Sequence, residues 1–524
     1  MKYKNPIILC DYSDPDVCRI GDDFYMVASS FNFVPGLPIL HSTDLVNWQL
    51  VNYACKTIPL PGYEKVQNAR GIWAPSIRFH DGKFFIFVGL PDEGIYFTQT
   101  TNPLEDWSEL KCVWSGKGFI DPCPLWEKDE NNNERLFVVH GYAKSRIGFN
   151  SKLGLLEVNP SNFNAISDDK IIFDGRKTQP TIEGPKFYKR NGYYYIFAPA
   201  GGVTNGWQTV LRSKKIDCEY EEKIVLAQGK SKINGPHQGA WVETRAGEDW
   251  FIHFQDAGIY GRITHLQPMR WVNDWPVMGN AVSLPDEKAL SVVGEPVKKW
   301  KAPVSRSECK QRQQREHSIK DAFQNSANPS KNTFCTNEAS LWHSPAVCTK
   351  KIDTKEFTYE RKFVLSEKAW RTGERRGIIF LGNEYAAFQI TKTNEGSFLL
   401  AYLESTGSEN GDDERQEKIL WSKEIFPNVT EEAKSQPEFV SESYILPECA
   451  TGGNFSFTQK SNYRKLDNQI SVSLRMKFHP DKDGRSGIVQ FFIKDKISDK
   501  KLAFKSKPFK TRNAHWVGGR YGWF

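Results

Sequence analysis

Three carboxylic acids in this sequence stand at matching places in three separate segments. They are Asp14 and Asp121, each directly before a proline, and Glu183, directly before a Gly-Pro step. Two further segments carry Trp73 and His237 at the same place. Carboxyl groups that share one cavity raise each other's pKa, which is useful mainly when one of them must keep a proton near neutral pH. The spacing therefore predicts a site for general acid–base chemistry, with one carboxylate as base and one carboxylic acid as proton donor.

A turn followed by an alternating, aromatic-rich strand lies roughly ten residues after each of these positions, and such alternation is typical of β-strands. The five turn-and-strand segments are 21–27, 81–87, 133–139, 189–197 and 247–253. Their spacing is irregular, about 50 to 60 residues, which indicates a propeller or a similar array rather than a helical solenoid. If each repeat is a four-stranded blade, the five side chains lie at equivalent ends of the innermost strands and converge on a central axis.

The chain is long enough for two domains. It has 524 residues, of which 39% are hydrophobic and 13% aromatic, enough to build large β cores. Residues 297–320 are basic and polar without strand alternation, and we interpret them as a linker between domains. Short alternating strands in 321–524 predict a β-sandwich, with a polar surface insertion at 405–436. The predicted domains are therefore 1–296, 297–320 as linker, and 321–524.

Composition argues against several classes of partner. The net charge of +7 is modest and spread along the chain, so we expect no nucleic-acid partner. The sequence has no apolar run of membrane-spanning length, and residues 1–11 lack the apolar core of a signal peptide, so we expect no membrane partner and a cytoplasmic protein. A secreted or periplasmic location would follow if a leader had been removed.

The ten cysteines show no Cys-x-x-Cys pair and no metal-ligand spacing, which favours free, mostly buried thiols. The alternative is one or two disulfides in a secreted protein. Glycosylation triplets at 428–430 and 454–456 support that alternative only weakly, because such triplets arise often by chance.

Each candidate also has a purely structural interpretation. An isolated Asp14 before proline suits an Asx-turn, Trp73 suits a core, and a single histidine such as His237 is more often structural than a ligand. The apolar loop that contains Phe31 could line a sugar site or serve as a packing anchor. Three carboxylates at one cavity would be costly for a structural core, however, and glycoside hydrolysis needs one base, one protonated acid and a means of keeping that acid protonated.

The sequence resembles the family 43 glycoside hydrolases, which are five-bladed β-propellers. The resemblance rests on residues 5–48, 71–87, 118–126 and 182–197, together with the Gly261-Arg262 pair. Residues 373–390 and 515–524 are similar to the concanavalin-A-like β-sandwich that follows the propeller in β-xylosidases and related α-L-arabinofuranosidases. The resemblance therefore implies an all-β chain, with a five-bladed β-propeller followed by a β-sandwich.

The resemblance assigns roles to the three acids. It implies that Asp14 is the general base, that Glu183 is the general acid, and that Asp121 modulates the pKa of Glu183 and orients it.

The resemblance also implies roles around the acids. Phe31 and Trp73 would line the terminal-sugar pocket, and Arg262 would bind the sugar and hold the base. His237 matches the residue that stands by a central hydrated cation, often calcium, although a water-filled axis would serve equally. No cofactor is implied to be required.

The expected function is an inverting, exo-acting hydrolase that releases β-D-xylose, α-L-arabinofuranose or both from short hemicellulose-derived oligosaccharides. A homo-oligomer is left open. Exo-specificity is less directly implied than catalysis, because 321–343 and the insertion from Ser405 depart from the family pattern. The alternatives are an endo-acting arabinan or xylan hydrolase of the same family, a non-catalytic carbohydrate-binding propeller, and a protein-interaction propeller.

Overall fold

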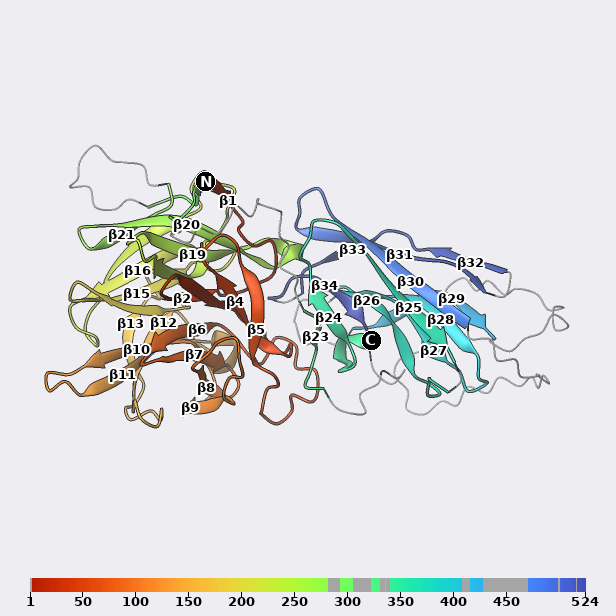
Figure 1. Cartoon of the computed structure of the whole chain (residues 1–524), viewed down its shortest axis with the longest axis horizontal. Coiled ribbons are helices and arrows are strands. Elements are labelled where there is room, and N and C mark those ends of the chain that lie inside the picture. The colour runs from red at the N-terminus through yellow and green to blue at the C-terminus, as the bar shows by residue number, and fades with distance from the viewer. Residues whose placement is uncertain are drawn as a thin grey trace. The chain divides into compact units, whose positions relative to one another are not determined.

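The computed structural model of the protein describes residues 2–280, 293–304, 322–329, 335, 340–366, 368–407, 415–426, 470–497, 500–514 and 516–524. Nearly all of its regular elements are β-strands (Figure 1). The chain divides into two compact units, one formed by Met1–Tyr63 with Gln67–Ala322 and the other by Glu64–Val66 with Phe323–Phe524. None of the helices in the described part of the chain combines the length and the apolar character that a membrane span requires.

Several predictions fall partly or wholly outside the described residues. These are residues 305–320 of the predicted linker, residues 408–414 and 427–436 of the predicted insertion, both glycosylation triplets, Cys309 and Cys449. The other eight cysteines are free thiols, and five of them are buried.

The first unit contains five antiparallel sheets of four strands each, and every sheet uses four strands that are consecutive in the chain. The first two sheets are β2 (Asp16–Ile20), β3 (Asp23–Val27), β4 (Gly36–Ser42), β5 (Gln49–Cys55) and β6 (Pro75–His80), β7 (Lys83–Leu90), β8 (Gly94–Thr100), β9 (Lys111–Ser115). The third and fourth are β10 (Phe119–Lys128), β11 (Glu134–Tyr142), β12 (Lys152–Val158), β13 (Lys170–Asp174) and β14 (Lys186–Arg190), β15 (Tyr193–Ala200), β16 (Trp207–Ser213), β17 (Glu221–Ala227). The fifth is β18 (His237–Glu243), β19 (Asp249–Asp256), β20 (Arg262–Val272), β21 (Trp275–Met278). The helices α1 (Lys144–Ile147) and η1 (Gly258–Tyr260) lie in the connections.

The predicted turns join the first and second strands of each sheet. In two of them, Asp81-Gly82 and Asn191-Gly192, both residues have positive φ, at 43° and 75° and at 50° and 72°. Two-residue hairpins whose twist matches the strands need this conformation, and Asp-Gly and Asn-Gly pairs adopt it readily. The turn chemistry in the sequence therefore correctly predicts these hairpins.

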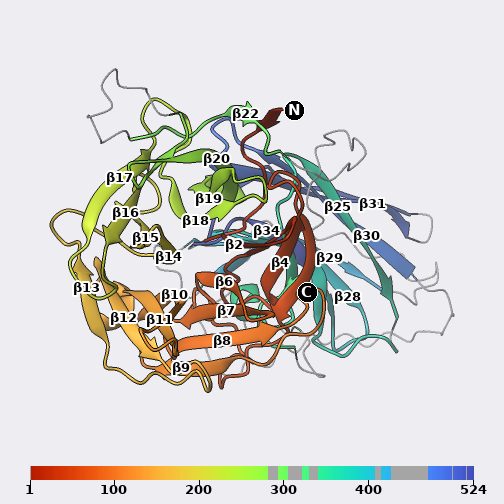
Figure 2. The same cartoon turned by 60° about the vertical axis from the view of Figure 1, so that its left-hand side comes forward.

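The inner strands of the five sheets form a closed ring. The strand β2 contacts β6, β6 contacts β10, β10 contacts β14, β15 contacts β18, and β18 contacts β2. Figure 2 shows the first strand of each sheet toward the centre and β9, β13 and β17 toward the periphery. Such radially repeated four-stranded sheets are consistent with a propeller.

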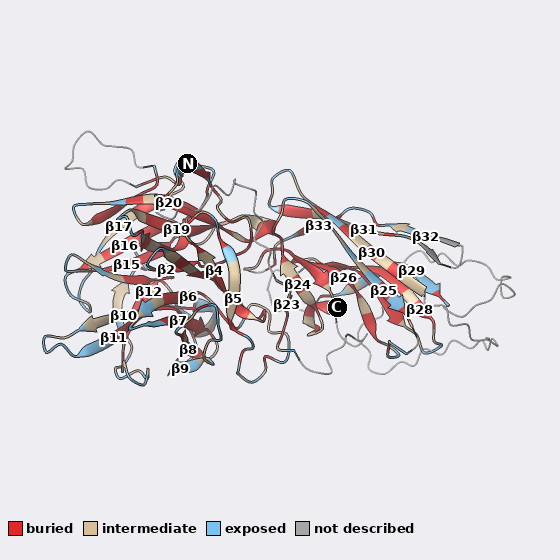
Figure 3. Cartoon of the chain, viewed as in Figure 1, coloured by how far each residue is buried: buried red, intermediate tan, exposed pale blue. Residues whose placement is uncertain are grey.

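Each pair of neighbouring sheets encloses one apolar cluster. The first and fifth sheets share Met26 and Leu266, and the first and second share Ile39 and Ile86. Equivalent clusters lie between the second and third, third and fourth, and fourth and fifth sheets. Figure 3 shows these strands as largely buried. The alternation seen in the sequence thus supplies apolar faces on both sides of each sheet.

The N-terminal segment bonds to the last sheet. Short strands β1 (Lys2–Lys4) and β22 (Lys299–Lys301) pair with each other. The amide of Ile7 donates to the carbonyl of Thr264 at 3.0 Å, and the amide of Tyr12 donates to the carbonyl of Arg262 at 3.1 Å. The start of the chain is therefore fixed along β20.

The second unit consists of two antiparallel sheets. Seven strands form the first sheet, in the order β23 (Gln324–Asn325), β24 (Cys348–Lys351), β34 (Arg520–Trp523), β26 (Arg375–Leu381), β27 (Ala386–Lys392), β28 (Phe398–Ser405), β29 (Glu417–Ile425). The second sheet contains β25 (Phe357–Leu365), β30 (Ile470–Pro480), β31 (Ser486–Ile497), β32 (Lys500–Lys505) and β33 (Phe509–Arg512), and η2 (Leu341–His343) lies in a connection. Aromatic pairs join the two sheets, for example Phe380 with Phe478 at 5.3 Å and Tyr402 with Phe491 at 5.5 Å between ring centroids. This is the layered arrangement of a β-sandwich.

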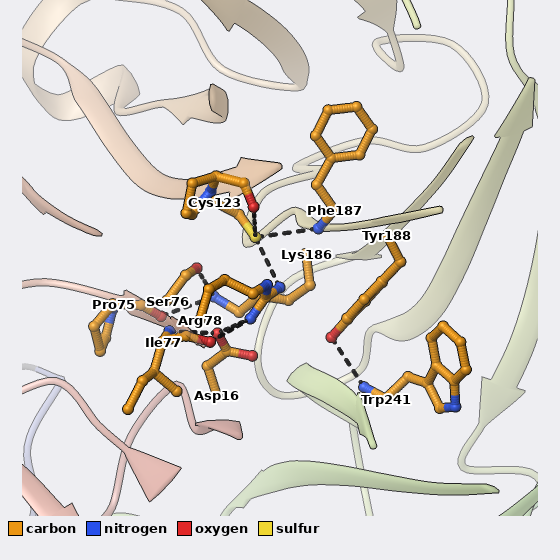
Figure 4. Close-up of polar contacts among 11 residues, drawn as sticks. Asp16, Pro75, Ser76, Ile77, Arg78, Cys123, Lys186, Phe187, Tyr188 and Trp241 are labelled. Carbon is orange, nitrogen blue, oxygen red and sulfur yellow. Dashed lines mark hydrogen bonds and ion pairs between the residues drawn. The ribbon is translucent and has the colours of Figure 1, made fainter. Parts of the chain in front are cut away.

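Buried polar contacts connect the inner strands of the first unit (Figure 4). The wholly buried Asp16 of β2 accepts hydrogen bonds at 2.6 Å from the Arg78 guanidinium and at 2.7 Å from the Ile77 amide, both of β6. Arg78 also donates to the sulfur of Cys123 in β10 at 2.9 Å, and its guanidinium lies 5.0 Å from the centroid of the Tyr188 ring in β14. A single arginine thus connects four of the five sheets.

We expect Arg78→Met to destabilise the protein by about 3 to 5 kcal/mol, because it leaves the Asp16 charge buried without its partner. Arg176→Met is the matched control. Arg176 also pairs with an aspartate, but its side chain is 65% exposed, and such surface pairs contribute about 0 to 1 kcal/mol. Urea unfolding followed by tryptophan fluorescence measures both effects. Equal losses in the two variants would show that burial of the Asp16–Arg78 pair is unimportant.

Candidate active site

Asp14 and Asp121 have the same unusual backbone conformation. Their φ angles are 57° and 58°, in the left-handed region that aspartate tolerates better than most residues, and each precedes a proline. In the fourth sheet the residue with this conformation before proline is Gly184, with φ 57°, not Glu183. The predicted equivalence of Glu183 with the two aspartates is therefore wrong by one residue.

Gly184 holds that position for a steric reason. A Cβ atom there would lie 2.6 Å from Cδ and 2.8 Å from Cγ of Gln238. The glycine lets the chain pass close to β18, and Glu183 precedes it with its amide donating to the carbonyl of Pro199 at 3.1 Å. The acid is thus carried on a loop fixed at both ends.

Asp14 is paired with a cation. Nη1 of Arg262 lies 3.1 Å from Oδ1 and 3.4 Å from Oδ2 of Asp14, and the hydroxyl of Ser29 donates to Oδ2 at 2.5 Å. The Asp14 carboxylate, 3% exposed as a residue, is fixed by charge-assisted bonds. Its remaining lone pairs can accept a proton from a water molecule.

Arg262 is itself held by its neighbours. Its amide donates to Oδ1 of Asp11 at 2.8 Å, and its guanidinium lies 4.9 Å from the centroid of the Phe254 ring. Gly261 has φ 71°, and a Cβ atom there would collide with the Asp11 carboxylate. The N-terminal segment and β20 therefore position this guanidinium together.

Asp121 accepts hydrogen bonds from two neutral groups. The Gly184 amide donates to Oδ2 at 2.8 Å, and Nε2 of Gln238 donates to the same oxygen at 3.4 Å. Burial and then the Asp14 charge raise the pKa of Asp121 to about 7, although the Lys186 charge and the Gly184 amide lower it. The donors at Asp121 thus offset part of the effect of burial.

Glu183 is the acid that keeps its proton. Burial and then the charge of Asp121 raise the pKa of Glu183 to about 8, although 30% of the side chain is exposed. Nε2 of His237 lies 3.5 Å from Oε1, and burial followed by the Arg262 charge lowers the pKa of this histidine to about 3. At neutral pH an uncharged imidazole therefore faces a protonated carboxyl group.

Phe31, in the loop between β3 and β4, pairs with Ile72, the neighbour of Trp73 in the loop before β6. The amides of Phe31 and Ile72 donate to each other's carbonyls at 2.8 and 2.9 Å. Phe31 is only 5% exposed, so it can form a wall but not an open stacking surface. Trp73 is partly exposed, and the Arg146 guanidinium lies 5.1 Å from its ring centroid. A contact of either residue with a sugar stays a prediction.

His237 is the candidate for a cation site. Both of its ring nitrogens are buried without a hydrogen-bond partner. Within the described residues, no three side chains of His, Cys, Asp or Glu are grouped so that they could hold a metal ion. A hydrated cation would therefore have one imidazole as its protein ligand, and calcium prefers several oxygen ligands. The cation remains a prediction.

Sequence reasoning missed several residues of the site. Ser29 contacts Asp14, Gln238 contacts Asp121, and Arg146 lies over Trp73. Gln238 could have been found as the neighbour of His237, and the Gly-Pro step could have shown that Gly184 takes the left-handed position. Ser29 and Arg146 carry no local signal, because their partners are distant in the chain.

Comparisons with known proteins identify the family of the chain. The model of glycosyl hydrolases family 43 matches residues 3–276. A putative beta-xylosidase of Xylanibacter ruminicola is 42% identical over 307 residues, which cover 58% of this chain and 54% of the relative. A non-reducing end alpha-L-arabinofuranosidase of Bacteroides ovatus is 29% identical over 299 residues, covering 53% of each chain. The chain thus spans about half the length of these curated relatives.

Solved structures share the fold. A xylan beta-1,4-xylosidase from Bacillus halodurans C-125 superimposes with a TM-score of 0.70, covering 99% of this chain and 96% of its own. The sequence identity of that pair is 19%, so this likeness concerns the fold alone.

We expect Gly184→Ala to destabilise the protein more than Gly192→Ala does. Both positions have positive φ, which costs a residue with a Cβ about 1 to 2 kcal/mol. Only Gly184 is also crowded, which adds about 1 to 3 kcal/mol, whereas nothing lies within 4 Å of a Cβ atom at Gly192. The urea midpoints of the two variants measure the difference, and equal midpoints would contradict the close approach of Gln238.

Proposed function

The chain belongs to glycosyl hydrolases family 43, and from this we propose that it is an inverting, exo-acting hydrolase. It releases β-D-xylose, α-L-arabinofuranose or both from the ends of hemicellulose-derived oligosaccharides. In this proposal the five sheets of the first unit are the blades of a five-bladed β-propeller, and the second unit is a concanavalin-A-like β-sandwich. Relatives named as a putative beta-xylosidase and as an alpha-L-arabinofuranosidase support both sugars.

One observation carries the proposal: the environments of Asp14 and Glu183 differ in charge. A guanidinium stands 3.1 Å from Asp14, whereas Glu183 has neutral His237 beside it and a pKa raised to about 8 by burial and then by Asp121. Two carboxyl groups whose environments separate their protonation states are what an acid–base pair requires. A carbohydrate-binding protein has no need of a protonated glutamic acid.

In the proposed reaction Asp14 acts on water and Glu183 acts on the leaving group. Asp14 accepts a proton from a water molecule while the oxygen of that water forms a bond to the anomeric carbon. Glu183 gives its proton to the glycosidic oxygen as the bond between that oxygen and the anomeric carbon breaks. The products are a sugar with inverted configuration and an alcohol that carries the proton from Glu183. Asp14 is left protonated by the attacking water and Glu183 is left ionised.

The other residues support these two. Arg262 holds Asp14 and can donate a hydrogen bond to a sugar hydroxyl, while Asp121 orients the loop of Glu183 through the Gly184 amide at 2.8 Å. The negative charge of Asp121 disfavours loss of the Glu183 proton. Asp121 is therefore proposed to modulate the acid without touching the substrate.

The direct test compares aryl β-D-xylopyranoside with aryl α-L-arabinofuranoside by kcat/KM and follows the first product by proton NMR. We expect hydrolysis of at least one substrate and an inverted anomeric configuration. Hydrolysis of neither, with binding of oligosaccharide retained, would favour a carbohydrate-binding protein. A product of retained configuration would make Asp14 a nucleophile instead of a base.

Replacing each acid should affect substrates differently. Glu183→Ala should lower kcat/KM on the order of 100-fold to 10,000-fold on natural oligosaccharides. The loss of kcat/KM on a dinitrophenyl glycoside should be much smaller, because a good leaving group departs without protonation. Asp14→Ala should lose comparably on both, since every substrate needs the attacking water. Steady-state kinetics with circular dichroism as a folding control measure this. Equal losses on both substrates in Glu183→Ala would mean that another group is the acid.

A further inference from the structure

Lys186 is a lysine that is wholly buried inside the first unit. Its ammonium donates to the carbonyl of Pro75 at 2.9 Å and to the hydroxyl of Ser76 at 3.0 Å (Figure 4). Lys186 begins β14 in the fourth sheet, whereas Pro75 and Ser76 begin β6 in the second. These two sheets are not neighbours, because β10 of the third sheet contacts both β6 and β14. The side chain therefore crosses the inside of the ring past β10, the strand that contains Asp121.

The partners of Lys186 do not balance its charge. A buried ammonium is costly unless an opposite charge compensates it, and both acceptors here are neutral. Within the described residues, no ion pair joins Lys186 to a carboxylate at 4.0 Å or less. An anion at somewhat longer range must offset this cost, and hydrogen bonds to neutral groups only fix where the ammonium lies.

Asp121 is a buried aspartate with no ion pair at 4.0 Å or less among the described residues. The other two buried aspartates at the inner strands have one each, Asp14 with Arg262 at 3.1 Å and Asp16 with Arg78 at 2.6 Å. The strand of Asp121 is bonded to that of Lys186, because the Phe187 amide donates to the sulfur of Cys123 at 3.2 Å. Among the groups that lower the pKa of Asp121, the Lys186 charge acts most strongly, ahead of the Gly184 amide.

We propose that Lys186 is a positioning residue of the site, whose buried ammonium offsets part of the charge of Asp121 and so favours the ionised form of Asp121 beside Glu183. Each buried aspartate of the ring then has one cation, and Glu183 is the carboxyl group that holds a proton. The kinetic consequence rests on the proposed function, but the electrostatic coupling does not. Lys186 reaches no substrate and acts only through Asp121.

Other charged or titratable groups lie on the elements packed around this pair. Asp14 raises and Arg262 of β20 lowers the pKa of Asp121, and the charge of Asp121 raises that of Glu183. The rest are Asp11 of the N-terminal segment, Asp16 of β2, Arg78 of β6, Cys123 of β10, Tyr188 of β14 and His237 of β18. A substitution that removes only the Lys186 charge leaves this set unchanged.

The first experiment measures the stability of the full chain as Lys186→Met at pH 5 and pH 8. Burial and the Asp14 charge already raise the pKa of Asp121 to about 7, and loss of the ammonium raises it further, so folded Lys186→Met holds this proton still more tightly than the unfolded chain does. Stability is therefore lost as the pH rises. We expect the thermal midpoint of Lys186→Met to fall further below wild type at pH 8 than at pH 5. Ser76→Ala is the matched control, because it removes one acceptor and no charge, and its deficit should be the same at both values.

A double-mutant cycle with Asp121→Asn tests whether Asp121 is the partner. At pH 8, Asp121→Asn should destabilise Lys186→Met less than it destabilises the wild type. The difference should be about tenfold in the unfolding constant, since coupled buried charges show interaction energies of that size. If Lys186→Met does not fold by itself, folding of the double variant supports the coupling. Failure of Asp121→Asn to improve it contradicts the proposal.

Kinetics give a second readout if the wild type hydrolyses an aryl pentoside. Loss of the Lys186 cation raises the pKa of Asp121. The acidic limb of the pH profile of kcat/KM should therefore move to higher pH in Lys186→Met, by on the order of one unit. Ser76→Ala should leave that limb in place. The proposal is wrong if the acidic limb of Lys186→Met does not move and its loss of stability is the same at both pH values. Lys186 would then have only a structural role. An inactive wild type would overturn the proposed function, while the stability measurements would still decide the role of Lys186.

Discussion

A charge that is buried where five strands converge must be matched by an opposite charge or removed by a proton, and the first unit depends on this constraint. Asp16 is matched by Arg78 at 2.6 Å, and Asp14 by Arg262 at 3.1 Å. Glu183 has a neutral histidine as its neighbour and keeps a proton instead. The same rule therefore also places one carboxyl group beside a cation and another beside a neutral histidine. The unequal distribution of cations is enough to make the two carboxyl groups different.

The backbone supplies the precision that this distribution needs. Asp14, Asp121 and Gly184 take the same left-handed conformation before a proline, so the same local geometry occurs in or just before β2, β10 and β14. At two of these positions aspartate carries the carboxyl group directly, and at the third a glycine moves the acid, Glu183, back by one residue. Because Glu183 has a longer side chain than aspartate, the shift alters both its reach and its exposure. Two roles thus arise from one repeated turn.

Local patterns in the sequence predict local structure well, and this explains which predictions succeeded. The Asp81-Gly82 and Asn191-Gly192 pairs specify their hairpins, because the turn conformation depends only on adjacent residues. The acids before proline were recognisable for the same reason. The contact between Asp16 and Arg78 joins residues 62 positions apart, and no local sequence pattern at either residue predicts it. The register of Glu183 and the burial of Phe31 and Lys186 likewise depend on how separate sheets meet, which one sequence does not specify.

The bonds between the N-terminal segment and β20 set an order in time. Asp11 and Tyr12 are synthesised well before Arg262, yet both bond to the backbone of that residue, about 250 positions later. Until β20 has been synthesised, Asp14 has neither its guanidinium partner nor a closed ring around it. Earlier sheets can pair their own strands as they emerge, since each uses consecutive segments. A nascent chain that stops before residue 262 can therefore pair the strands of its earlier sheets but lacks the cation beside Asp14, so the site can be completed only in a late step.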